Sequence, residues 1–130
     1  MQKEIIRVPV LSDSVEKRNV SLSLVVKAGD FLFVSGVPPL NLQTGEIERG
    51  DIRQQTKLCL EVLKSCLETA GSTLDKVVKT TILLTNAAYS DDVNEIYGKY
   101  FPHNPPARTF CTVGSWPMKF DIEIDCIAIT

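Results

Sequence analysis

An arginine that follows two prolines is the residue of this chain whose type and setting most clearly suggest chemistry. The stretch Pro105-Pro106-Ala107-Arg108-Thr109 places Arg108 at the mouth of an expected strand. Proline fixes its own φ and pushes the preceding residue toward extended backbone, so Arg108 leaves a stiff elbow and is aimed in one direction. A guanidinium stays charged and matches a carboxylate with two parallel hydrogen bonds. We therefore expect Arg108 to bind an organic acid, the alternative being a surface ion pair of little energetic value.

A glutamate in the last expected strand is the second candidate. Glu123 stands fifteen positions after Arg108 in an otherwise apolar segment, and it shares a strand face with Asp125 because side chains alternate between faces. Such an acid either faces solvent or is held in a site, where it would orient a water molecule. The same alternation predicts that Phe110 shares the face of Arg108 and that Cys111 points away from it, into the core.

Length and composition restrict the class of protein. The chain has the size of one domain, residues 1–130, and its 44% hydrophobic and 23% charged residues are typical of a globular protein. No stretch approaches the ~18 uninterrupted apolar residues of a membrane span, and the start has no export signal, so we expect a cytoplasmic protein without a membrane partner. The net charge is −2 with basic residues scattered singly, which argues against a nucleic-acid partner.

Neither a metal site nor a disulfide is expected. The four cysteines have no C-x-x-C spacing, and the only histidine, His103, stands in a proline-rich loop. Cys59 and Cys66 would lie about 10 Å apart along one helix, too far for a disulfide. We expect all four cysteines to be buried thiols.

Hydrophobic periodicity outlines an α+β protein. The expected elements are two hairpin strands at 20–26 and 31–35, a helix at 51–70, a strand at 77–84, a helix at 90–101, and two closing strands at 108–114 and 120–130. Helices grouped in this way would cover one face of a mixed sheet. The other face would then need a partner, so we expect an oligomer.

Segments of the chain, in their order, resemble those of the Rid family, the reactive intermediate deaminases of the YjgF type. No single segment is decisive; the ordered set is. These segments are Ala28-Gly29-Asp30 leading to Val34-Ser35-Gly36, Thr44-Gly45-Glu46, Ala70-Gly71, Val77-Val78-Lys79-Thr80-Thr81, Val93-Asn94-Glu95-Ile96-Tyr97, Pro106-Ala107-Arg108-Thr109 and the run from Ile122 to Ala128.

The resemblance implies a chorismate-mutase-like α+β fold. Its mixed six-stranded sheet would carry two helices on one face, and three copies would form a homotrimer with clefts between subunits. Members of this family hydrolyse enamine and imine acids, such as 2-aminoacrylate and 2-iminopropanoate, to 2-oxo acids and ammonia. They need no cofactor, so the implied partners are a small imino or 2-oxo acid and further copies of the chain.

The resemblance also assigns roles to residues of this chain. Arg108 would grip the substrate carboxylate, Glu123 would position the attacking water, and Asn94 corresponds to the family asparagine of the second helix. The backbone around three further residues would line the cleft: Ser35, Gly36 and Thr109. Positioning of this kind supplies much of the acceleration for an electrophilic C=N bond.

Two positions depart from the family pattern. Leu22 stands where a tyrosine is commonest, and Phe110 where a cysteine is commonest. Both changes make the expected pocket less polar and favour bulkier or more apolar substrate side chains. Two alternatives stay open: a non-catalytic protein that binds 2-oxo acids or amino acids and regulates a partner enzyme, and a deaminase of aminomuconate-like enamines.

Overall fold

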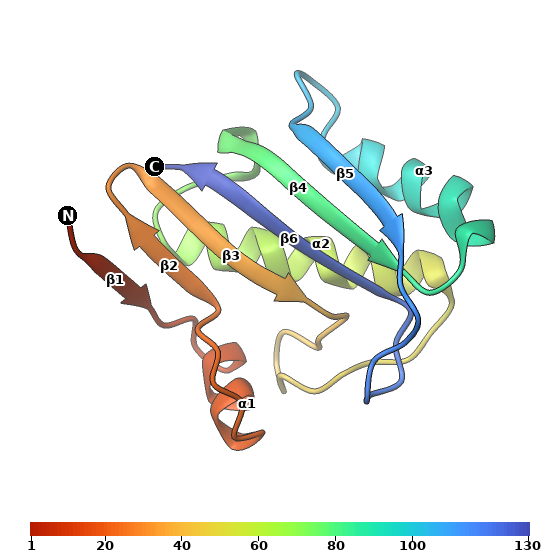
Figure 1. The fold of residues 1–130 in the computed structure, drawn as a ribbon, viewed down its shortest axis with the longest axis horizontal. Coiled ribbons are helices and arrows are strands. Elements are labelled where there is room, and N and C mark those ends of the chain that lie inside the picture. Colours follow the sequence, from red (N-terminus) through yellow and green to blue (C-terminus); the bar gives the residue numbers. More distant parts are fainter.

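A six-stranded mixed sheet organises the chain, and a computed structural model describes all residues from 1 to 130 (Figure 1). The strands lie in the order β1-β2-β3-β6-β4-β5, and all neighbours are antiparallel except β4 and β5. The strands are β1 (Lys3–Ile6), β2 (Val25–Ala28), β3 (Phe31–Val37), β4 (Val77–Leu84), β5 (Ala107–Thr112) and β6 (Ile122–Ile129). The helices are α1 (Leu11–Lys17), α2 (Ile52–Thr69) and α3 (Ser90–Tyr100), and short 3-10 turns cover Leu74–Lys76 and Ala87–Tyr89.

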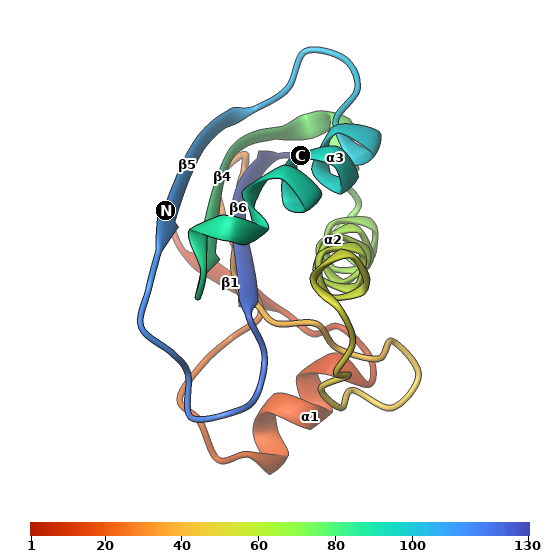
Figure 2. The ribbon, with the colours of Figure 1, turned by 90° about the vertical axis from the view of Figure 1, so that its right-hand side faces the viewer.

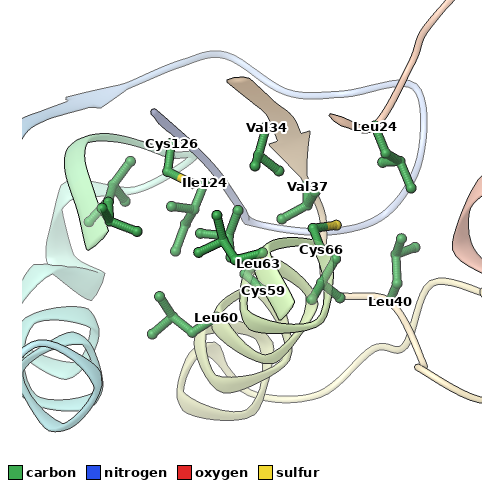
Figure 3. Packing of buried hydrophobic residues seen from close by; sticks show 14 of the residues in the cluster. Leu24, Val34, Val37, Leu40, Cys59, Leu60, Leu63, Cys66, Ile124 and Cys126 are labelled. Carbon is green, nitrogen blue, oxygen red and sulfur yellow. The ribbon is translucent and has the colours of Figure 1, made fainter. Parts of the chain in front are cut away.

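Helices α2 and α3 cover the same face of the sheet (Figure 2). Helix α2 begins where the Asp51 carboxylate accepts a hydrogen bond from the backbone N–H of Gln54 at 2.8 Å, and it ends before Gly71, whose φ of 82° suits a left-handed cap. Its apolar stripe packs on the middle strands. Figure 3 shows this core, formed by Cys59, Leu60, Leu63 and Cys66 of the helix with Val34, Ile124 and Cys126 of the sheet.

The opposite sheet face, which we call the open face, is covered by no element of the protomer (Figure 2). It carries large apolar side chains: Phe31 is 47% exposed, Phe33 44% and Ile129 40%. Adjacent exposed side chains of this size are typical of a surface that binds another protein. The strand order and the helices on one sheet face confirm the predicted α+β class and the mixed six-stranded sheet.

Several expectations are corrected. A third helix, α1, lies beyond one end of the sheet, so the fold has more than the two predicted helices (Figure 2). The first hairpin strand begins at Val25 rather than at residue 20, because residues 23 and 24 bond to Ser35 instead of extending the ladder. Cys111 is exposed rather than buried, since it lies on the open face of the edge strand β5.

No helix of this fold combines the length and apolar character that crossing a membrane requires.

Candidate functional site

Arg108 projects from the edge strand β5 toward helix α3. Its Nη1 atom donates a hydrogen bond to Oδ1 of Asn94 at 2.8 Å. The guanidinium carbon lies 5.1 Å from the ring centre of Tyr97 and 5.2 Å from that of Phe110, within the range of cation–π attraction. No carboxylate lies within ion-pair distance of the Arg108 guanidinium. The arginines that form ion pairs in this protein are Arg7 and Arg53. The guanidinium is therefore oriented while its charge stays uncompensated.

Helix α3 supplies the support for this arginine. Asn94 and Tyr97 lie three residues apart and therefore on one helix face. The buried hydroxyl of Tyr97 shares a hydrogen bond of 2.7 Å with Oγ1 of Thr80, which ties the aromatic ring to strand β4. On the exposed side of the helix, Arg53 of α2 forms ion pairs with Asp92 and Glu95 at 3.1 and 3.0 Å. These contacts fix the helix that holds Asn94 against the guanidinium.

Glu123 lies on the open face of strand β6, where it is half-buried. Its register partner is Leu83 of β4, which in turn pairs with Cys111 of β5. Burial raises the pKa of the Glu123 carboxyl above its ordinary value of 4.5; the indole of Trp116 acts in the opposite direction as a hydrogen-bond donor, and the charge of Asp125 raises the pKa further. A carboxylate whose pKa is raised is a stronger base, so it accepts a proton from a bound water molecule more readily.

A β-bulge in strand β3 brings backbone close to this carboxyl. The register between β3 and β6 shifts between Val34 and Val37, so that Ser35 and Gly36 form the bulge. A Cβ atom added at Gly36 would lie 2.8 Å from Oε1 of Glu123, closer than real Cβ contacts allow. The Ser35 hydroxyl donates to the carbonyl of Ser23 at 2.7 Å and so holds the preceding segment.

The remaining sequence candidates lie apart from Arg108. Thr109 is on the open face, where its Oγ1 accepts a hydrogen bond from Nζ of Lys79 at 2.7 Å. Leu22 is 44% exposed and borders a shallow depression next to Ile5 of β1 and Val15 of α1. Strand β1 is the edge of the sheet farthest from β5. Within one protomer, Leu22 is therefore remote from the arginine.

Arg108 and Glu123 do not meet within one protomer. Arg108 pairs with Thr80 and Thr80 with Cys126, three residues along β6 from Glu123. The two Cα atoms are thus about 10 Å apart along the strands and about 10 Å apart across them. Their side chains also leave opposite faces of the sheet. Any site that uses both groups has to combine them from two protomers.

Two supporting aromatic residues were not identified as site residues from the sequence. Helical periodicity alone places Tyr97 on an apolar helix face, although its spacing of three from Asn94 is a usable signal. Trp116 stands in the segment between the two closing strands, and nothing in the sequence indicates that its indole approaches Glu123.

Comparison with known proteins places this geometry in a family. A family model described as Endoribonuclease L-PSP matches residues 16–130. A RutC family protein of Pyrococcus horikoshii is 39% identical over 92% of this chain and 94% of its own length. The chloroplastic Reactive Intermediate Deaminase A of Arabidopsis thaliana is 40% identical over 88% of this chain and 63% of its own length.

Solved structures agree with this placement. A conserved Rid family protein of unknown function, YyfA from Yersinia pestis, superimposes with a TM-score of 0.90 at 34% identity, covering 99% of this chain and 100% of the other. The structure of Escherichia coli TdcF with bound serine superimposes with a TM-score of 0.80 at 30% identity, covering 85% of this chain and 89% of the other. The chain therefore belongs to the Endoribonuclease L-PSP family, the group whose members are also named YjgF, RutC and Rid.

Proposed function

We propose that this protein hydrolyses reactive imine and enamine acids to 2-oxo acids and ammonia, without a cofactor, in clefts between the protomers of a cytoplasmic homotrimer. The observation that carries the proposal is the Arg108 guanidinium, which Asn94 orients and two aromatic rings flank while no carboxylate neutralises it. An oriented and uncompensated cation is suited to bind the carboxylate of a small organic acid.

The reaction needs positioning more than a strong catalyst. With the substrate carboxylate on Arg108, a water molecule held by the Glu123 carboxylate attacks the carbon of the C=N bond and gives its proton to the carboxylate. The nitrogen of the resulting carbinolamine recovers that proton. The carboxylate then accepts the proton of the new hydroxyl group as the C–N bond breaks, so ammonia leaves and the 2-oxo acid remains. An enamine enters the same sequence after its β-carbon is protonated. The raised pKa of Glu123 makes its carboxylate a stronger base and so favours removal of the proton from the attacking water.

A second protomer completes this site. Arg108 and Glu123 leave opposite faces of one sheet, so a cleft containing both needs Arg108 of one copy and Glu123 of another. The open face supplies a reason for the copies to associate, because Phe31 and Phe33 remain exposed in the isolated protomer. A heterologous contact of this kind closes into a ring when its rotation permits, and a three-membered ring then contains three equivalent clefts.

The relatives support this chemistry over cleavage of RNA. Serine, the ligand named for TdcF, carries an α-carboxylate of the kind that a guanidinium binds. The Arabidopsis relative is named a reactive intermediate deaminase. The family description names an endoribonuclease, but the single histidine here, His103, lies exposed in the loop between α3 and β5, and the net charge is −2. Neither feature suits a nuclease site.

The first test removes the guanidinium of Arg108. Imino acids produced in situ by an amino-acid oxidase are supplied to the wild type and to Arg108→Ala, and ammonia release is measured above the uncatalysed rate. We expect the variant to lose at least about a hundredfold in kcat/KM, because both binding and orientation are lost. Arg18→Ala, which removes an arginine near α1, is the matched control and should keep full activity. Unchanged ammonia release by Arg108→Ala would overturn the assignment.

The second test asks whether the cleft joins two protomers. Arg108→Ala and Glu123→Gln are each expected to be inactive, and the two variants are then unfolded together and refolded as a mixture. Random assembly gives about a quarter of the clefts an intact arginine from one copy and an intact glutamate from the other, so about a quarter of wild-type activity should return. A mixture as inactive as its components contradicts a shared cleft.

A further inference from the structure

A hollow of about 470 Å³ lies at the end of the sheet where β6 begins. Its size is in the range of pockets that bind small molecules. The loop between β5 and β6 forms one wall, and residues from the start of α2 and the end of β4 form the other. The lining residues used below are Arg49, Gln55, Thr85, Trp116, Lys119 and Asp121.

The floor of this hollow is a closed hydrogen-bond network. Oδ1 of Asp121 accepts a hydrogen bond from Oγ1 of Thr85 at 2.9 Å, and Oδ2 accepts one from Nε2 of Gln55 at 3.0 Å. The backbone N–H of Asp121 donates in turn to Oε1 of Gln55 at 2.8 Å. Gln55 is only 4% exposed, so packing fixes this partner of the carboxylate in place. The floor is therefore rigid, and its one negative charge is already engaged.

Two cations border the same hollow. Arg49 and Lys119 both line it, and neither forms an ion pair with a carboxylate. Against these two positive charges the hollow holds a single carboxylate, that of Asp121. The long side chains can move their charged ends toward a ligand, so the hollow favours an anionic group.

Trp116 forms a wall common to the hollow and the surroundings of Glu123. Its ring stacks on Phe120 with centroids 4.5 Å apart and planes inclined by 26°. The ring lines the hollow, and the indole lies close enough to Glu123 to oppose the rise that burial causes in the pKa of its carboxyl. Asp121 in the floor precedes Glu123 by two residues, about 7 Å of strand. The hollow and the Glu123 carboxylate are therefore neighbours on one protomer.

We propose that this hollow is a subsite for the distal carboxylate of an acidic imino acid, with Arg49 and Lys119 as its ligands. The inference rests on the proposed function. The carbon attacked by water carries a carboxylate, a nitrogen and a side chain. With the carboxylate on Arg108 of a neighbouring protomer and the water on Glu123, a side chain that continues past Trp116 reaches the hollow. Its methylene groups pack on the indole, and its terminal carboxylate meets the two cations.

The test compares two imino acids of similar length. One is 2-iminoglutarate, made in situ from L-glutamate by glutamate oxidase, and the other is the neutral imino acid made from L-methionine. Wild type, Arg49→Ala, Lys119→Ala and the double variant are assayed for ammonia release. The double variant should raise KM for 2-iminoglutarate about three- to tenfold, the size expected for two exposed ion pairs, and leave the neutral substrate unchanged. Lys119→Arg should retain wild-type behaviour.

Controls separate the subsite from other causes. Lys64→Ala removes an exposed lysine from another face of α2 and should leave both substrates unaffected. An equal loss on both substrates, or no loss on either, overturns the subsite. If inorganic phosphate alters turnover of the neutral substrate in the wild type but not in the double variant, the hollow takes a separate anion, and the substrate proposal is also overturned.

A wild-type protein inactive on both imino acids would refute the proposed function rather than the anion site. Calorimetric titration then decides the hollow by itself, with glutarate and pentanoate as probes. Glutarate should bind more tightly than pentanoate to the wild type, and the difference should vanish in the double variant. Equal binding of the two acids to the wild type refutes the anion site.

Discussion

Gly36 and Glu123 are in direct contact across neighbouring strands: a Cβ atom built on Gly36 would lie 2.8 Å from Oε1 and 2.9 Å from the carboxyl carbon of Glu123. The contact arises because the bulge in β3 turns the Gly36 backbone toward the open face of β6. The absence of a side chain at residue 36 is thus what allows the carboxyl to occupy its position.

Gly36→Ala should lower activity by displacing this carboxyl. The new methyl group forces the Glu123 side chain into another rotamer, and a shift of about 1 Å in a catalytic group can cost about a hundredfold in rate. We expect kcat to fall tenfold to a hundredfold while KM changes little, because Arg108 is untouched. Gly98→Ala is a suitable control, since nothing lies within 4 Å of a Cβ atom there. Wild-type kcat for Gly36→Ala would contradict a role for Glu123.

Asn94 should act on substrate binding rather than on the water. Asn94→Ala removes the hydrogen bond of 2.8 Å that orients Arg108, which is worth about 1–2 kcal/mol, so KM should rise about five- to thirtyfold. Asn94→Asp should raise KM further, because a carboxylate beside the guanidinium competes with that of the substrate. Steady-state kinetics of both variants test this order. An Asn94→Asp variant that binds substrate as well as the wild type would argue against Arg108 as the anchor.

Local periodicity was enough to predict most elements of the sheet and both of the helices that cover it. The apolar spacing around Cys59 and Leu63 predicted α2, and the segment before Pro102 predicted α3, because each pattern is local. The prediction that Cys111 faces away from Arg108 is also confirmed, since alternation within one strand needs no knowledge of its neighbours.

The register between strands and the order of the strands in the sheet could not be predicted from local periodicity. Alternation shows that Arg108 and Phe110 share a face, but only the register through Thr80 to Cys126 reveals that Glu123 lies on the opposite one. The exposure of Cys111 follows from the place of β5 at the sheet edge, which no local pattern encodes. Helix α1 was missed because it spans only seven residues and its flanking residue Val10 adopts a φ of 69°, against its own preference.

The open face should hold the proposed trimer together. Phe33 is 44% exposed in the protomer, and burial of such a side chain contributes about 1.5–3 kcal/mol. Phe33→Asp should therefore yield monomers in light scattering after gel filtration, with hydrolysis lost because each cleft needs two copies. Leu42→Asp, which changes a 38% exposed leucine in a turn, should stay trimeric and active. An active monomer would rule out the shared cleft.

The half-buried carboxylate of Glu123 should lower the free energy of unfolding at neutral pH. Burial raises the pKa of this carboxyl, so the native state holds the proton more tightly than the unfolded state does. Stability therefore falls as pH rises from the ordinary value of 4.5 through the raised value, and the cost persists at neutral pH. Glu123→Gln removes the charge at nearly constant shape, so its Tm at about pH 7 should exceed that of the wild type by a few degrees, and the gain should shrink below pH 4.5. The same variant should be inactive. Calorimetry at both pH values tests the sign, and a Glu123→Gln variant less stable than the wild type at neutral pH would show that the charged carboxylate stabilises the fold instead.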